Sequence, residues 1–220
     1  VVLYGIDADY NSKYVWRGII CNNVPVIQPS AWVSVNDFTF LIWGNIVAGD
    51  EHYQGKINET DFTLSYSYKW WKICLAPSIN IYSYPNQDEY PSTGELILKI
   101  SHPVGIINIC SEHSIDVMEY SGSYYGTLGA SLEHKINDRL SVDTSISACY
   151  GSSKFNSVYL GVSKNALSII VASFSCNREL PFGFYVKPHI DVSKVLDNEL
   201  SEQIGKSTVR NIGVMAGKEF

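Results

Sequence analysis

Along the whole chain, short segments alternate apolar and polar residues with a period of two. Segment 59–68 is the clearest: Phe62 and Leu64 fall on one face, whereas Asp61 and Thr63 fall on the other. Such a period is typical of a β-strand whose two faces meet different surroundings. The pattern therefore predicts an all-β fold.

The connections between these segments alternate between short and long. Asn36-Asp37 and Asn137-Asp138 are typical of tight turns, whereas Gly49 to Asn58 and Pro85 to Thr93 are longer polar stretches. Short turns on one rim and long loops on the other are the layout of bacterial transmembrane barrels. We expect residues 1–220 to form one domain, an antiparallel transmembrane β-barrel of about 12 strands with short periplasmic turns and longer extracellular loops.

One segment leaves the strand count open. Gly151 to Ala166 is either a single long loop or contains a strand at Val158 to Val162. A strand there would make the count odd, whereas bacterial single-chain barrels have an even number of strands. Farther on, Asp197 to Lys206 is expected to be a polar loop before the last strand.

The last segment, Ser207 to Phe220, again alternates with a period of two and ends on an aromatic residue. In a closed barrel this strand would pair with the first one. A terminal Phe is what outer-membrane barrels present to the barrel-assembly machinery, so Phe220 is the expected assembly signal. The alternative is an ordinary C-terminal strand of a soluble sandwich.

Composition narrows the class of protein. Of the residues, 45% are hydrophobic and only 17% are charged, which is below the usual quarter for soluble domains. No apolar run approaches the roughly 18 residues that a spanning helix needs, so a bilayer would have to be crossed by a closed barrel. Because the sequence starts at Val1 within a strand-like run, we expect that a leader has been removed.

Charge and cysteine content exclude other classes. The net charge of −6 is scattered, and no basic patch points to nucleic acid as a partner. The cysteines are odd in number and widely spaced, which fits neither a disulfide framework nor a metal site: Cys21, Cys74, Cys110, Cys149 and Cys176. Free cysteines are commonest in reducing compartments, which is the one compositional point against export. We expect no cofactor and no metal.

Alternation alone does not decide which face of the sheet points outward. A soluble, lipocalin-like carrier would turn its apolar faces inward, whereas a membrane barrel turns them toward lipid. Aromatic residues near strand ends, such as Tyr14, Trp16 and Trp71, match an interfacial girdle and favour the membrane barrel. Three prolines within predicted strands, Pro29, Pro77 and Pro188, are not explained by this pattern.

If the apolar faces meet lipid, the charged residues line the lumen, because a basic residue facing lipid costs about 2–4 kcal/mol near the midplane. Acids outnumber bases, which predicts a pore for small hydrophilic solutes with a mild preference for cations. The alternative is a structural barrel whose lumen is filled by paired charges. The expected lumen residues are Asp7, Asp9, Arg17, Glu59, Asp61, Lys72, Glu95, Lys99, Glu112, Asp116, Glu133, Asp143, Lys187, His189 and Asp191.

We expect no catalytic residues, but one pair suggests an enzymatic alternative. Ser111 and His113 lie two apart on the apolar face of one predicted strand. In reversed order they resemble the arrangement of outer-membrane lipid A deacylases, in which a His activates a Ser for attack on an ester. Glu112 falls on the opposite face and could not orient His113.

Several runs of the sequence resemble the TorF-type porin family of bacteria. The resemblance covers most of the chain and implies a barrel in the bacterial outer membrane, with outer-membrane lipids as its surroundings, but it says little about a solute. The matching runs are Ser12 to Gly18, Pro25 to Pro29, Trp43-Gly44, Glu59 to Tyr68, Ile81 to Asn86, Thr93 to Glu95, Gly122 to Tyr125 and Phe220.

Overall fold

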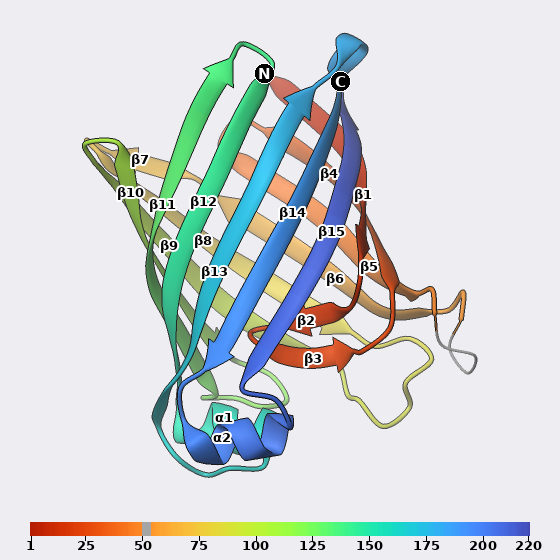
Figure 1. Ribbon diagram of the computed structural model, residues 1–220, viewed down its shortest axis with the longest axis vertical. Helices are drawn as coiled ribbons and strands as arrows, with labels where there is room; N and C mark the ends of the chain where they lie inside the picture. The colour runs from red at the N-terminus through yellow and green to blue at the C-terminus, as the bar shows by residue number, and fades with distance from the viewer. Residues whose placement is uncertain (50–53) are drawn as a thin grey trace.

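The computed structural model describes residues 1–49 and 54–220 and shows a closed antiparallel β-barrel (Figure 1). The barrel has twelve strands, as the sequence predicts, because β6 and β7 form one wall interrupted at Ser67. In chain order the walls are β1 (Val2–Asn11), β4 (Val26–Val35), β5 (Phe38–Val47), β6 (Ile57–Tyr66) with β7 (Tyr68–Trp70), β8 (Ile73–Ser83), β9 (Thr93–Val104), β10 (Ile107–Asp116), β11 (Tyr124–Asn137), β12 (Leu140–Gly151), β13 (Ala166–Glu179), β14 (Phe184–Val195) and β15 (Thr208–Glu219).

The last strand closes the barrel against the first. β15 pairs antiparallel with β1, from Gly5 opposite Glu219 to Asn11 opposite Gly213. Phe220 continues this seam: its amide donates to the carbonyl of Tyr4 at 3.0 Å, and the two rings stack with their centroids 5.1 Å apart.

Short and long connections alternate strictly, as predicted. Both termini and the short turns lie at one end of the barrel, and the long connections lie at the other (Figure 1). A left-handed residue helps to close four of the short turns: Asn36 with φ 54°, Trp71 with φ 54°, Gly105 with φ 63° and Gly183 with φ 78°. The 3-10 turn η1 (Pro181–Gly183) belongs to this end. Residues 50–53, which include His52 and fall within the expected loop Gly49 to Asn58, lie outside the described residues.

Three long connections contain secondary structure that the sequence pattern did not predict. After β1, β2 (Tyr14–Trp16) turns back and pairs with β3 (Ile19–Asn22). The ambiguous segment Gly151 to Ala166 is neither a bare loop nor a strand, since it holds helix α1 (Ser153–Leu160). The predicted polar loop Asp197 to Lys206 holds helix α2 (Asn198–Ile204). Within the described residues, no helix is long and apolar enough to cross a membrane.

Capping and apolar contacts explain the two helices. The Ser152 hydroxyl accepts from the amide of Phe155, and the Asp197 carboxylate accepts from the amides of Glu199 and Leu200. Lys164 lies 2.8 Å from Asp197, and this hydrogen bond lowers the pKa of the Asp197 carboxyl. Phe155 and Leu200 are buried in one cluster at the long-loop end. A period of two cannot reveal short helices of this kind, because their burial depends on tertiary packing.

The prolines lie where a strand lacks a bridging partner on one side. On β4, the bridges to β5 skip from Ile27 to Ser30, so Pro29 pairs with β1 alone. On β14, the bridges to β13 skip from His189 to Val186 past Pro188. On β8, Pro77 lies between the stretches that pair with β6 and β7. Proline supplies no donor, so each gap occurs where no N–H is available.

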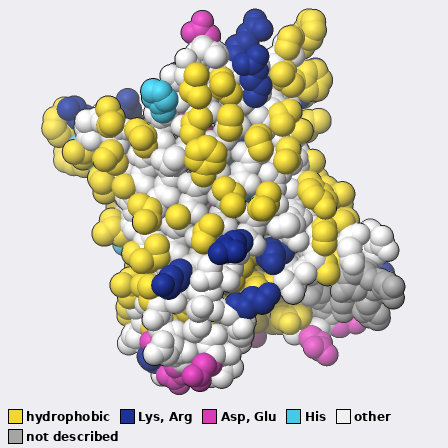
Figure 2. Space-filling model, in the orientation of Figure 1, with side chains coloured by type: hydrophobic (Ala, Val, Ile, Leu, Met, Phe, Trp, Pro, Cys, Tyr) yellow, Lys and Arg dark blue, Asp and Glu magenta, His cyan; other side chains and the backbone are white. Residues whose placement is uncertain are grey.

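The apolar faces point away from the barrel axis, as the sequence predicts for a membrane barrel. Leu64, Ile79 and Leu128 are 48%, 47% and 63% exposed, whereas the acidic Glu95 and Asp116 are 2% and 1% exposed. Hydrophobic side chains are spread over the outer surface of the strands (Figure 2). A soluble carrier would show the reverse, so the lipocalin-like alternative is wrong for this fold.

This orientation predicts how the barrel responds to a charge placed on either face. Leu128→Arg on the outward face of β11 should destabilise the folded barrel in liposomes by about 2–4 kcal/mol, because the guanidinium would meet lipid. Ser145→Arg is the control, since Ser145 lines a water-accessible cavity on the inward face of β12. Urea unfolding followed by tryptophan fluorescence gives both free energies of unfolding. Equal losses for the two variants would contradict the assigned orientation.

Candidate functional site: the barrel lumen

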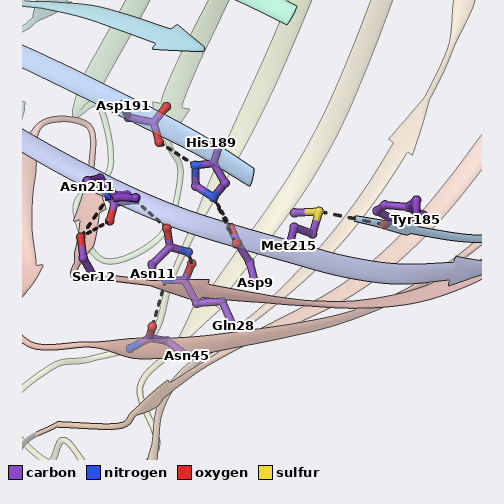
Figure 3. A network of polar contacts seen from close by, with 11 residues as sticks. Asp9, Asn11, Ser12, Gln28, Asn45, Tyr185, His189, Asp191, Asn211 and Met215 are labelled. Carbon is purple, nitrogen blue, oxygen red and sulfur yellow. Dashed lines mark hydrogen bonds and ion pairs between the residues drawn. The ribbon is translucent and has the colours of Figure 1, made fainter. Parts of the chain in front are cut away.

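A chain of amide side chains crosses the lumen wall at the seam of the barrel (Figure 3). Asn211 on β15 donates to Asn11 on β1 at 2.6 Å, and Asn11 donates to Gln28 on β4 at 3.0 Å. Gln28 donates to Asn45 on β5 at 3.0 Å, and Asn45 donates to Asn58 and Asn22. These bonds join five walls and reach β3 through Asn22, so polar groups that would otherwise be buried without partners are satisfied.

Beside this amide chain lies a histidine held between two carboxylates (Figure 3). Nδ1 of His189 lies 3.1 Å from Asp191, and Nε2 lies 3.1 Å from Asp9 across the seam. Gly213 makes room for the ring, because a Cβ at this position would stand 2.4 Å from Nε2 of His189. The packing of the seam therefore requires glycine at position 213 of β15.

Nearer the short-turn rim, further polar contacts line the wall. The Ser30 hydroxyl donates to Asp7 at 2.8 Å, and the Tyr185 hydroxyl lies 3.4 Å from the same carboxylate. Lys187 lies 3.6 Å from Asp143. These pairs bridge neighbouring or nearby strands, and their charges face away from the apolar outer surface.

The lumen holds a cavity of about 730 Å³ on the short-turn side. The titratable residues that line it are Asp9, Glu133, Asp143 and Asp191 on the acidic side, and Lys187 and His189 on the basic side. Gly105 and Ile106 of a short turn also line it, so the cavity reaches that rim. Its wall combines polar groups with more carboxylates than basic groups.

At the other end lies the β2–β3 hairpin (Figure 1), whose turn reaches the inward face of β9 through Arg17. Its turn consists of Arg17 and Gly18, both left-handed with φ 49° and 79°. Arg17 donates to Glu95 on β9 through both terminal nitrogens, each at 2.7 Å, and Tyr82 donates to the same carboxylate at 2.9 Å. The Arg17–Glu95 pair is bidentate and buried, which fixes the hairpin in one geometry.

Aromatic and aliphatic packing adds to this closure. The guanidinium of Arg17 lies 4.5 Å from the centroid of the Trp16 ring and 4.7 Å from that of Tyr125. Trp16 also packs against Phe155 of α1, within the apolar cluster that contains Leu200 of α2. The connections that contain α1 and α2 therefore pack against the hairpin.

The structure brings most of the predicted lumen residues onto the inward face of the walls. Arg17 is the first exception, because it reaches the lumen from the hairpin instead of a wall. Lys72 is the second: it lies in the Trp71–Lys72 turn at the short-turn rim, where its ammonium lies 5.4 Å from the Trp71 ring, so its placement on a lumen wall was wrong. The inward wall positions are Asp7, Asp9, Glu59, Asp61, Glu95, Lys99, Glu112, Asp116, Glu133, Asp143, Lys187, His189 and Asp191.

Ser111 and His113 lie on the outward face of β10, as expected from their spacing. Nδ1 of His113 hydrogen-bonds the Tyr124 hydroxyl at 2.8 Å. Glu112 faces the lumen and lies 3.3 Å from Lys99. Within residues 1–49 and 54–220, no hydrogen bond joins Ser111 to His113 and no acid orients the ring, so this geometry gives no support to an acyl hydrolase.

Sequence reasoning missed the amide chain and the hairpin closure. Asn11, Gln28, Asn45 and Asn211 all occupy polar positions of the alternating pattern, but that pattern says nothing of which strands are neighbours. The pair Arg17-Gly18 is the local signal for the hairpin turn, since Gly readily adopts a left-handed conformation.

The hairpin contact predicts a stability difference between two ion pairs of the lumen. Glu95→Ala would leave the buried guanidinium of Arg17 without its carboxylate and should destabilise the barrel by about 3–5 kcal/mol. Lys99→Ala removes a more exposed pair, with Glu112, and should cost no more than about 1 kcal/mol. Urea unfolding in liposomes measures both. A Glu95→Ala loss as small as the Lys99→Ala loss would contradict the assigned role of the pair.

The fold is shared with solved outer-membrane channels. A KdgM porin aligns over 96% of this chain and 97% of its own, with a TM-score of 0.55 and 12% identity. The NanC porin aligns over 97% of both chains, again with a TM-score of 0.55 and 12% identity. The COG4313 outer membrane channel from Pseudomonas putida F1 aligns over 100% of this chain and 95% of its own, with a TM-score of 0.55 and 8% identity.

No protein-family model and no curated protein matches the sequence. The TorF-type resemblance therefore stays a prediction, since at these identities the structural likeness shows the fold alone. The geometry and the comparisons together show a twelve-stranded β-barrel with the fold of porin-type outer-membrane channels.

Proposed function

We propose that this protein is a passive channel for small hydrophilic solutes in the bacterial outer membrane, with a mild preference for cations. One observation carries the proposal: an apolar outer surface surrounds a polar lumen that holds a cavity of about 730 Å³ lined by excess carboxylates. Its fold is shared with the KdgM porin, the NanC porin and the COG4313 outer membrane channel, which supports the same function and location. The hairpin at the long-loop end implies a narrow pathway and a small conductance.

The charge selectivity of the pore tests whether permeating ions pass through the lumen cavity. Glu133→Gln removes a carboxylate that lines the cavity, whereas Lys187→Gln removes a cation from the same wall. A unit charge about 10 Å from a permeating ion changes the free energy of that ion by about 0.4 kcal/mol in water, with opposite signs for a cation and an anion. Each substitution should therefore shift the cation-to-anion permeability ratio about fourfold. The two shifts should have opposite signs.

The measurement is the reversal potential of single channels in planar bilayers under a KCl gradient. Leu128→Ala on the outward face serves as the control and should leave the ratio unchanged. If Glu133→Gln and Lys187→Gln both leave the ratio unchanged while the pore conducts, ions do not pass this cavity.

A non-conducting structural barrel is the second candidate, and a specific observation favours it. Arg17 and Glu95 form a buried pair across the lumen, and aromatic side chains pack around them. The double variant Arg17→Ala/Glu95→Ala removes the pair without leaving one charge alone. A silent native protein and a conducting double variant would identify a closed barrel, whereas unitary conductance of the native protein would identify a channel.

We further propose that Phe220 forms part of the signal that the barrel-assembly machinery recognises. Its exposed ring, about half accessible, lies at the end of the closing strand next to β1. Deleting Phe220 should reduce the amount of folded barrel in cells several-fold. Tyr4→Ala is the matched control, because it removes the stacked ring and keeps the terminal Phe. Heat-modifiable migration on gels measures the folded fraction, and equal reductions in both variants would mean that the stack alone matters.

A further inference from the structure

A second cavity, separate from the lumen cavity, lies at the long-loop end of the barrel and has a volume of about 250 Å³. The β2–β3 hairpin forms one side, the connection between β8 and β9 forms another, and α1 contributes Tyr159. We call it the mouth pocket. Its volume is below the roughly 300–1,000 Å³ of pockets for drug-sized ligands, which favours a ligand of few heavy atoms.

Aromatic rings line the mouth pocket in two groups. Trp16 and Tyr159 form an edge-to-face pair with centroids 5.0 Å apart. Tyr84 and Tyr90, from the connection between β8 and β9, form a tilted pair with centroids 6.0 Å apart. Tyr and Trp rings carry a negative face, and a pocket lined by several of them attracts a cation stripped of part of its water.

One acidic side chain lies in this pocket. Glu59, at the start of β6, lines it and is only 7% exposed. Its neighbour in the pocket is the side chain of Tyr14, and no ion pair to Glu59 occurs among residues 1–49 and 54–220. Arg17, the cation on the same hairpin, is bound by Glu95. Burial without a positive partner disfavours the charged form of this side chain, so a cation bound beside it would favour the ionised form.

The composition of the pocket also selects the kind of cation. Within the described parts of the chain, no group of three His, Cys, Asp or Glu side chains is placed to hold a metal ion. A hard metal ion needs several oxygen ligands, whereas an alkylammonium group needs aromatic faces and one counter-charge. We propose that the mouth pocket binds a small organic cation of the alkylammonium class, with Glu59 as the counter-ion and the tyrosine and tryptophan rings as its cage.

The test is a titration of the purified full-length barrel in neutral detergent by isothermal calorimetry. Choline is the probe, and 3,3-dimethylbutan-1-ol, which has the same shape without the charge, is the matched ligand. We expect saturable heat with choline and at least tenfold weaker binding of the neutral alcohol. Equal binding of the two would mean an apolar pocket without cation recognition and would overturn the proposal.

Variants locate the site. Glu59→Gln keeps the shape and removes the charge, so it should weaken choline binding at least tenfold. Asp37→Asn removes an exposed carboxylate from the short turn between β4 and β5, at the other end of the barrel, and should leave the affinity unchanged. If Glu59→Gln binds choline as tightly as the native protein, or Asp37→Asn weakens it equally, the assignment is wrong.

A further variant changes an exposed residue, so that a loss of binding cannot be caused by misfolding around a buried position. Tyr90 is exposed and belongs to a connection outside the walls, so Tyr90→Ala should fold normally and weaken choline binding about twofold to fivefold. Unchanged affinity for this variant would exclude the cage. The proposal does not depend on the channel function, because calorimetry reads binding whether or not the barrel conducts.

Discussion

Closure of the sheet is the constraint on which the rest of this structure depends. A strand edge facing lipid would leave a row of backbone donors and acceptors without partners, and each such group costs several kcal/mol. Here β15 returns to β1 and removes the edge. Because side chains alternate across each strand, closure also divides the chain into an apolar outer surface and a polar interior. The lumen, its charges and its amide chain follow from that division.

The interior is organised by polar groups that satisfy one another across the seam. The amide chain from Asn211 to Asn45 joins the last strand to the first three walls. His189 lies between Asp9 and Asp191, so the same seam carries charge as well as hydrogen bonds. Glycine at position 213 leaves the space that these side chains occupy. The seam is therefore held by side-chain contacts in addition to the backbone ladder.

The features of the fold that depend on the local pattern of residues could be predicted from the sequence. Alternation at Phe62 and Leu64 against Asp61 and Thr63 gave the strands and, with the aromatic girdle, the correct outward face. Strict alternation of turn lengths gave the strand number. The prolines looked anomalous because the gaps in the ladder at Pro29 and Pro188 depend on the neighbouring strand.

The features that escaped prediction depend on tertiary contacts. Residues 14–16 form a strand, but this strand pairs with β3 and not with a wall strand. The hairpin holds this position because Arg17 binds Glu95, which is 78 positions away in the sequence. Phe155 and Leu200 stabilise two short helices only when both are brought over the barrel mouth. Lys72 has a charge typical of the lumen, yet it follows the last paired residue of its strand.

The walls of the barrel and the cluster formed by α1, α2 and the hairpin depend on different surroundings for their stability. The walls owe their order to an amphiphile around their apolar surface, whereas the cluster around Phe155, Val195 and Leu200 buries its own apolar atoms as the centre of a water-soluble domain does. The long-loop end should therefore keep its structure when the thickness or the lipid composition of the bilayer changes. The geometry of the mouth pocket then does not depend on the membrane around the barrel.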